Sequence, residues 1–347
     1  MMALEYSLPG NTVSHKNLGR EELEGEISAI LDGYSQANLL TTLGDVEWKI
    51  SNKGKCALLG ADKLQRKLDG DAPSFEKAIE ALDNKKNYIL RGDEDFLIRL
   101  GVSDKSGRVH DKRQGKFRQI NRFLEHIDDI YTKLPAEGEL TVYDLCCGKS
   151  YLSFAVYYFL HILKGRRVSM LGIDLKRDVI DWCSLTAREL GYNGMRFVYD
   201  DVRNTPKGVR PDMVISLHAC DVATDIVINS AAELGARVIL STPCCHRYLN
   251  DKIAARELLF VTEHPHLKNK LCEALTDALR LSRLKSLGYD VSALELTDPD
   301  DTPKNTLIRA IRRERVGAGE LDSLRAEYDR LVGFVLGDGK DNYLKGI

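Results

Sequence analysis

From residue 140 onward, short apolar runs alternate with segments in which apolar residues recur every three or four positions. Runs of the first kind predict buried strands, and the longer periodic segments predict amphipathic helices. The predicted strands are 141–145, 168–173, 195–199, 211–217, 237–241, 291–296 and 305–312. The helices predicted between them start at 151 and cover 178–190, 222–234 and 251–287. Five strand–helix units followed by a two-stranded hairpin predict an α/β fold with a seven-stranded sheet.

The pattern before residue 116 is shorter and more often interrupted. Residues 46–50 alternate like a strand and 73–82 look helical, so 1–115 is predicted to form a small α+β domain. The larger domain is then 116–314, and its first predicted element is a helix over 116–130 with an apolar stripe. A last amphipathic stripe predicts that 315–347 adds a C-terminal helix packed on the protein.

Composition and charge do not indicate a membrane-spanning protein, a disulfide-rich secreted protein or a strongly basic protein. The formal net charge of the 347 residues is -2, so the whole chain exerts no electrostatic attraction toward nucleic acid, and no DNA partner is expected. No run approaches the roughly 18 apolar residues of a membrane span, and the start does not resemble a signal peptide. The eight cysteines include the adjacent pairs Cys146-Cys147 and Cys244-Cys245, which are poorly placed to bridge each other. Reduced thiols in a cytoplasmic protein are therefore expected.

Candidate chemistry begins at the turn between the first predicted strand and its helix, in TVYDLCCGKSYLSFA at 141–155. A small-residue turn before a helix lets backbone N–H groups approach a polar or anionic ligand closely. Asp174 ends the second strand, where a carboxylate can hold a ribose diol. The turn is not the G-x-G-x-x-G of a dinucleotide-binding protein. An ordinary strand–helix crossover without a ligand is the alternative for this turn alone.

The acidic residue before the turn resembles the E/D-x-G-x-G-x-G loop of class I (Rossmann-like) S-adenosylmethionine (SAM) methyltransferases, with Cys and Ser at two glycine positions. The resemblance implies SAM as the cofactor. The methionine end of SAM is then expected at the turn, the ribose at the second strand, and the adenine between residues that follow the second and third strands. The expected cofactor residues are Asp144, Cys146, Gly148, Ser150, Asp174, Leu175, Asp201 and Val202.

Two polar clusters follow the fourth and fifth strands, at 218–225 and 244–246. Ligands of open α/β sheets bind beyond the carboxyl ends of the strands, so both clusters are expected to face the methyl group. The leading interpretation is a pocket in which His218, Asp221 or His246 accepts the proton of the methyl acceptor. Cys220, Asp225, Cys244, Cys245, Lys304 and Asn305 are expected to contact the substrate.

Other interpretations of these clusters remain open. A cysteine nucleophile is one, although the flanking residues do not match RNA cytosine-C5 methyltransferases. A metal site is another, but the spacing fits no zinc signature, so no metal is expected. Buried structural thiols are a third interpretation.

The separated motifs together resemble the bacterial members of a SAM-dependent methyltransferase-domain family whose eukaryotic relatives include ribosomal RNA adenine dimethylase domain-containing proteins. They are DLCCGKSYL at 144–152, LHACDVATD at 217–225, PCCH at 243–246 and TPKN at 302–305. A more distant similarity connects 217–225 and 244–246 with the tRNA 2′-O-methyltransferases of the acceptor stem, although Leu217 stands where that family has Lys. These resemblances imply direct methyl transfer to tRNA or rRNA.

A locally basic segment supports an RNA partner. Residues 105–122 hold seven Lys or Arg against one acid, Asp111. Because phosphate contacts supply much of the affinity for nucleic acid, this segment is predicted to contact RNA phosphates. The alternative is that it is a solvated linker and helix face without a partner. A protein or small-molecule methyltransferase, a SAM-binding module without catalysis, and a nicotinamide-dependent oxidoreductase are the remaining alternatives.

Overall fold

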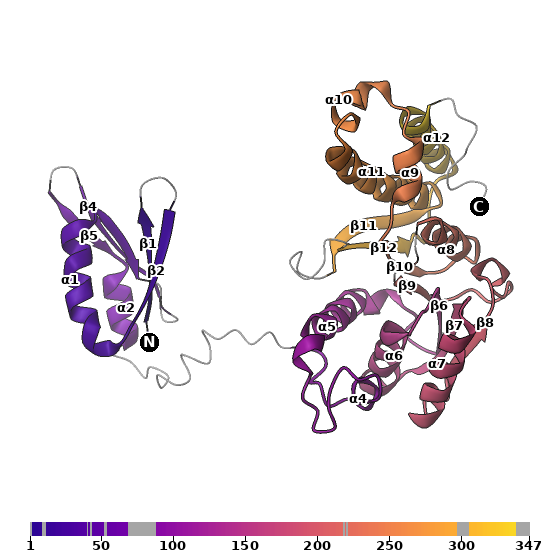
Figure 1. Ribbon diagram of the computed structural model, residues 1–347, viewed down its shortest axis with the longest axis horizontal. Helices are drawn as coiled ribbons and strands as arrows, with labels where there is room; N and C mark the ends of the chain where they lie inside the picture. The colour runs from indigo at the N-terminus through magenta and orange to yellow at the C-terminus, as the bar shows by residue number, and fades with distance from the viewer. Residues whose placement is uncertain are drawn as a thin grey trace. The chain divides into compact units, whose positions relative to one another are not determined.

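The computed structural model describes residues 2–8, 12–39, 41, 44–51, 54–68, 88–217, 219, 221–296 and 305–337. The helix predicted at 73–82 lies outside these residues, as do three of the predicted site residues, His218, Cys220 and Lys304. The chain divides into two compact units, Met1–Asn87 and Tyr88–Ile347 (Figure 1).

The boundary predicted at residue 115 is wrong, because the second unit already begins at Tyr88. The segment from 88 to 113 contains α4 (Asp95–Arg99) and η2 (Asp111–Arg113). Its apolar side chains are buried in the same core as the helix that follows, among them Leu90, Phe96 and Val102. Its strand and helix signals are short, so the sequence pattern did not reveal this packing.

The first unit is a small α+β structure, in agreement with the sequence pattern. A two-stranded antiparallel sheet pairs β1 (Met2–Leu8) with β2 (Thr12–Leu18). A second antiparallel sheet has the order β3 (Gln36–Leu39), β4 (Val46–Ile50) and β5 (Cys56–Leu59). Its helical elements are η1 (Arg20–Glu22), α1 (Leu23–Gly33) and α2 (Ala61–Leu68).

A seven-stranded sheet with the order β11-β12-β10-β9-β6-β7-β8 forms the centre of the second unit. Its strands are β6 (Glu139–Leu145), β7 (Arg167–Asp174), β8 (Met195–Tyr199), β9 (Met213–Leu217), β10 (Val238–Thr242), β11 (Tyr289–Glu295) and β12 (Thr306–Arg312). The strands β6 to β10 pair in parallel, while β12 runs antiparallel to both of its neighbours. This order, with an inserted antiparallel strand, is the class I Rossmann-like methyltransferase sheet, so the predicted fold class is confirmed.

Alternating residues of the central strands face two helical layers. Val142 belongs to the core under α5 (Gln114–Asp129), α6 (Tyr151–Tyr157) and α7 (Arg177–Glu189). Tyr143 belongs to the opposite core, which includes side chains of α8 (Val222–Glu233) and α11 (Pro265–Ser286) (Figure 1). The remaining short helices of these layers are η3 (Tyr131–Lys133), the π-helix η4 (Tyr158–Leu163) and η5 (Val202–Asn204). Two covered faces explain why β10 is apolar along most of its length and buried throughout.

The long helix predicted at 251–287 is interrupted. It consists of α9 (Arg247–Lys252), η6 (Arg256–Leu258), α10 (Leu259–Thr262) and α11. Pro265 begins α11 after an extended residue at 264, because a proline lacks the N–H that a continuing helix would need. The last helix, α12 (Ala318–Leu336), packs through Tyr328, Val332 and Val335 on a separate small core with α9 and α11 (Figure 1). No helix of the described ranges combines the length and apolar character needed to cross a bilayer.

Candidate active site

The loop between β6 and α6 has three residues in a backbone conformation that glycine favours, although only one of the three is a glycine. Cys146, Gly148 and Ser150 have positive φ angles of 64°, 52° and 54°. A side chain at such an angle costs roughly 1–2 kcal/mol, so Cys146 and Ser150 store strain. The loop is held to β7 by hydrogen bonds from Cys147 N to the Ile173 carbonyl (3.1 Å) and from Gly148 N to Asp174 Oδ2 (2.8 Å).

A cavity of about 240 Å³ opens beside this loop, at the carboxyl ends of β6, β7 and β9. Its lining residues are Lys116, Asp144, Cys146, Cys147, Gly148, Lys149, Ser150, Tyr151, Leu152, Asp174, Lys176, Leu217 and Ala219. Five of the residues predicted to hold the cofactor are therefore brought together, namely Asp144, Cys146, Gly148, Ser150 and Asp174.

Asp144 is the buried acid of this cavity, with 3% of its surface exposed. Ser153 donates a hydrogen bond to its Oδ2, whereas Oδ1 has no hydrogen-bond partner among the described residues. Burial raises the pKa of Asp144 to about 7, and the nearby charge of Asp174 contributes in the same direction. An unpaired buried carboxyl oxygen beside a cavity fits a ligand that brings its own hydrogen-bond donor.

Asp174 connects the cavity to the tip of β7. Its two carboxylate oxygens accept hydrogen bonds from Gly148 N (2.8 Å) and Lys176 N (3.0 Å). A carboxylate offers about four acceptor sites, so Asp174 can still accept bonds from a pair of hydroxyl groups. Together with the free oxygen of Asp144, these groups fit the ammonium and ribose of SAM.

Three further predicted cofactor residues do not line the cavity. Leu175 is 62% exposed, and Val202 is buried in the core that includes α8. The Arg203 guanidinium binds both carboxylate oxygens of Asp201, at 3.0 and 2.7 Å, and holds the Asp201 pKa down at about 2. The cavity is thus matched to the amino-acid and ribose end of the cofactor, and contact with the adenine at these three residues stays a prediction.

A second group of polar side chains follows β10, the neighbour of β9. His246 Nε2 lies 3.0 Å from Asp277 Oδ1 of α11, and the His246 side chain is 5% exposed. Its Nδ1 has no hydrogen-bond partner among the described residues. When Nε2 donates its proton to Asp277, Nδ1 carries a lone pair that is free to accept a proton.

Arg280 of α11 binds Asp277 of this group and is fully buried. Its guanidinium donates to Asp277 Oδ1 (3.0 Å), Asp225 Oδ1 (2.6 Å) and the Asp221 carbonyl (3.1 Å). The sequence singles out Asp277 and Arg280 as possible substrate contacts, with a surface ion pair as the alternative. They do form an ion pair, three positions apart on α11, but it is buried and not at the surface.

Asp225 was expected to contact the substrate, but its side chain is 0% exposed and paired with Arg280. In this structure it fixes Arg280, and a contact with the substrate stays a prediction. Asp221 is partly buried, has a positive φ of 49°, and accepts a hydrogen bond from Tyr248 N (3.2 Å) through Oδ1. That contact turns its carboxylate toward the start of α9, and a role for Asp221 as a base stays a prediction.

The described cysteines are all reduced thiols. Cys244 and Cys245 are partly buried, with their sulfur atoms 3.7 Å apart. Burial raises the pKa of Cys147 strongly and that of Cys183 to about 11, which leaves both protonated near neutral pH. Within the described ranges, no three His, Cys, Asp or Glu side chains are arranged to hold a metal ion.

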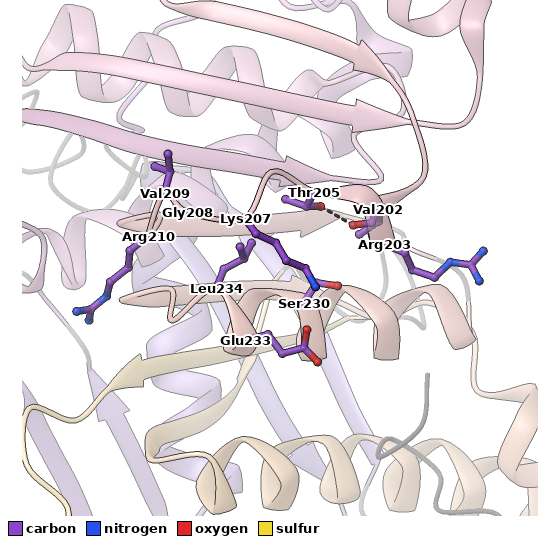
Figure 2. A pocket seen from close by; sticks show the side chains of 10 residues that line it. All are labelled: Val202, Arg203, Thr205, Lys207, Gly208, Val209, Arg210, Ser230, Glu233 and Leu234. Atoms are coloured by element: carbon purple, nitrogen blue, oxygen red, sulfur yellow. Dashed lines mark hydrogen bonds between the residues drawn. The ribbon is translucent and has the colours of Figure 1, made fainter.

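Asn305 lies just before β12, where its carbonyl accepts a hydrogen bond from Leu296 N (2.9 Å). Its substrate contact stays a prediction, as do those of Cys244 and Cys245. A second pocket lies between the 202–210 segment and α8, and Figure 2 shows the side chains that line it. Its volume is about 400 Å³. Its lining extends from Val202 and Arg203, which follow β8, to Arg210 and Leu234 near the amino ends of β9 and β10, and it shares no residue with the cavity.

Comparison with known proteins agrees with this geometry. Residues 115–252 match a protein-family model described as a methyltransferase domain. The match covers less than half of the chain and makes this segment similar to methyltransferase domains, for which SAM is the expected cofactor.

Curated relatives are mammalian and longer than this chain. A glutathione S-transferase C-terminal domain-containing protein of Macaca fascicularis is 22% identical over 68% of this chain and 40% of its own length. The corresponding Homo sapiens protein is 22% identical over 61% of this chain and 36% of its own length. The chain thus spans about 40% of the length of these relatives, and they do not support the bacterial origin expected from the motifs.

A solved structure of magnesium protoporphyrin IX methyltransferase from Synechocystis PCC 6803 with bound SAM is 16% identical. The match covers 58% of this chain and 82% of that one, with a TM-score of 0.37. The assignment of the fold rests on the strand order and does not depend on this likeness.

Proposed function

We propose that this chain transfers the methyl group of SAM to an RNA acceptor, with tRNA or rRNA as the substrate class. The observation that carries the methyltransferase part is the cavity at the tips of β6 and β7, where Asp144, Gly148 and Asp174 converge. The RNA part is supported by the basic segment at 105–122 and by the similarity of 217–225 and 244–246 to tRNA methyltransferases.

The protein residues have three tasks in this reaction. When bound, SAM supplies an electrophilic methyl group on its sulfonium. Asp144 and Asp174 orient the two ends of the donor at the tips of β6 and β7. His246, at the tip of β10, accepts the proton that the acceptor hydroxyl or amine loses, through its free Nδ1.

Asp277 positions His246 in this scheme. Its hydrogen bond to Nε2 selects the tautomer in which Nδ1 is unprotonated, and Arg280 in turn fixes Asp277. Donor and acceptor must approach to roughly 3–3.5 Å, so much of the rate enhancement comes from holding both in place.

The test is to incubate the purified protein with labelled SAM and, separately, with total RNA, total protein and small metabolites from cells that lack the gene. Label is expected in RNA, and digestion then identifies the methylated atom. His246→Asn is expected to lower transfer by roughly 100-fold or more, as for loss of a general base, while the affinity for S-adenosylhomocysteine is kept.

The matched control is His264→Asn, because the side chain of His264 is 61% exposed and lies outside the site. Label found only in protein or metabolites contradicts the RNA assignment. Binding of S-adenosylhomocysteine without transfer to any fraction indicates a SAM-binding module without catalysis. A thermal shift with NADH but not with S-adenosylhomocysteine favours the oxidoreductase alternative.

A further inference from the structure

Lys116 is the half-buried cation of the cofactor cavity. It lies in the first turn of α5 and lines the cavity together with Asp144, Gly148 and Asp174. The other two lysines of the lining, Lys149 and Lys176, are exposed. The sequence pattern assigned Lys116 to the basic segment, so its place in the cavity was not predicted.

The Lys116 ammonium makes its contacts with two neutral side chains. Its Nζ donates to Gln119 Oε1 at 2.8 Å and lies 5.2 Å from the centre of the Tyr151 ring. Within the described part of the chain, no carboxylate lies at ion-pair distance from Nζ. The two acids of the cavity are engaged elsewhere, Asp144 with Ser153 and Asp174 with Gly148 and Lys176.

Partial burial of an unpaired cation is unfavourable. Desolvation lowers the pKa of Lys116 to about 8, and the charge of Arg113 contributes to this shift. A binding site can keep a desolvated cation when the ligand supplies the opposite charge, because the ion pair then forms in a partly dehydrated site. The missing partner at Lys116 is an anion.

We propose that Lys116 binds the α-carboxylate of the amino-acid end of SAM, with Gln119 and Tyr151 holding its ammonium in place. This inference rests on the proposed function and adds a residue that selects the cofactor. The amino-acid end of SAM carries one carboxylate and one ammonium. The cavity offers a matching half-buried cation in Lys116 and a free carboxyl oxygen in Asp144.

The test compares two ligands that differ by this carboxylate alone, SAM and decarboxylated SAM, by calorimetry. Lys116→Met is expected to weaken SAM binding by roughly 10- to 100-fold, the range for a hydrogen bond between charged groups. The same variant is expected to leave the affinity for decarboxylated SAM unchanged. Lys116→Arg keeps the charge and is expected to retain part of the preference for SAM.

Lys149→Met is the matched control, because Lys149 lines the same cavity but is exposed. It is expected to change SAM affinity much less than Lys116→Met. An equal loss for both ligands in Lys116→Met, with thermal unfolding like the wild type, would overturn the carboxylate assignment. A wild-type protein that binds neither ligand contradicts the proposed function itself, which separates the two failures.

Discussion

At the scale of the residue, Asp144 is a carboxyl group that the fold keeps away from water under the Cys146–Ser150 loop. Its pKa of about 7 in the folded protein lies well above the ordinary value of 3.8. Between about pH 4 and 7 the folded state therefore holds a proton that the unfolded state has lost. Stability against unfolding is expected to fall as the pH rises through this window.

Asp144→Asn removes this titration and tests it. The variant is expected to unfold like the wild type near pH 4 and to be more stable above pH 7, by up to about 1.4 kcal/mol for each pH unit that separates the folded and unfolded pKa values. Urea denaturation across the pH range measures the difference. Because Asn lacks the charge for the cofactor ammonium, SAM affinity is expected to drop in the same variant. Parallel stability curves for the two proteins would contradict a raised pKa at Asp144.

At the scale of the element, Arg280 joins α11 to the start of α8. Its buried side chain binds Asp225 of α8, Asp277 of its own helix and the backbone of Asp221. Removal of one member of a buried ion pair leaves a charge without compensation, at a cost of roughly 3–5 kcal/mol. The position of His246 depends on this arrangement through Asp277.

Arg280→Met is accordingly expected to destabilise the unit from Tyr88 onward by about 3–5 kcal/mol in urea denaturation. Arg280→Met combined with Asp225→Leu is expected to recover part of that stability, because the double variant removes one of the buried carboxylates that the single variant leaves without a cationic partner. The matched control is Arg325→Met, whose ion pair with Asp322 is exposed and worth less than about 1 kcal/mol. Equal effects of Arg280→Met and Arg325→Met would show that the buried pairs do not hold these helices together.

At the scale of the whole molecule, a net charge of -2 gives no general attraction to RNA, so binding depends on a local surface. Lys105 and Lys112 are exposed in the basic segment, and both belong to the second unit, Tyr88–Ile347. Lys116 does not belong to this surface, because it lines the cofactor cavity. A test of RNA binding therefore has to leave Lys116 and its neighbour Arg113 intact.

The double variant Lys105→Glu/Lys112→Glu is expected to weaken RNA binding and to flatten its dependence on salt, by about one unit of slope for each phosphate that the protein no longer neutralises. The affinity for S-adenosylhomocysteine is expected to stay the same. Lys133→Glu/Lys285→Glu makes the same charge change at exposed lysines of η3 and α11 and serves as the control. Filter binding over a range of salt concentrations measures both pairs, and identical slopes would argue for an acceptor other than RNA.

The sequence by itself determined the seven strands, the strand–loop–helix at 141–155 and the place of Asp144, Gly148 and Asp174 at strand ends. These features follow from periodicity and local turn chemistry, which short segments carry within themselves. Periodicity indicates that a side chain is buried but does not identify its partner. Tertiary packing alone therefore decided that Arg280 meets Asp225, 55 positions away, that Val202 enters the core, and that Lys116 lines the cavity. The unit boundary at Asn87 was likewise decided by long-range burial of residues whose local pattern is weak.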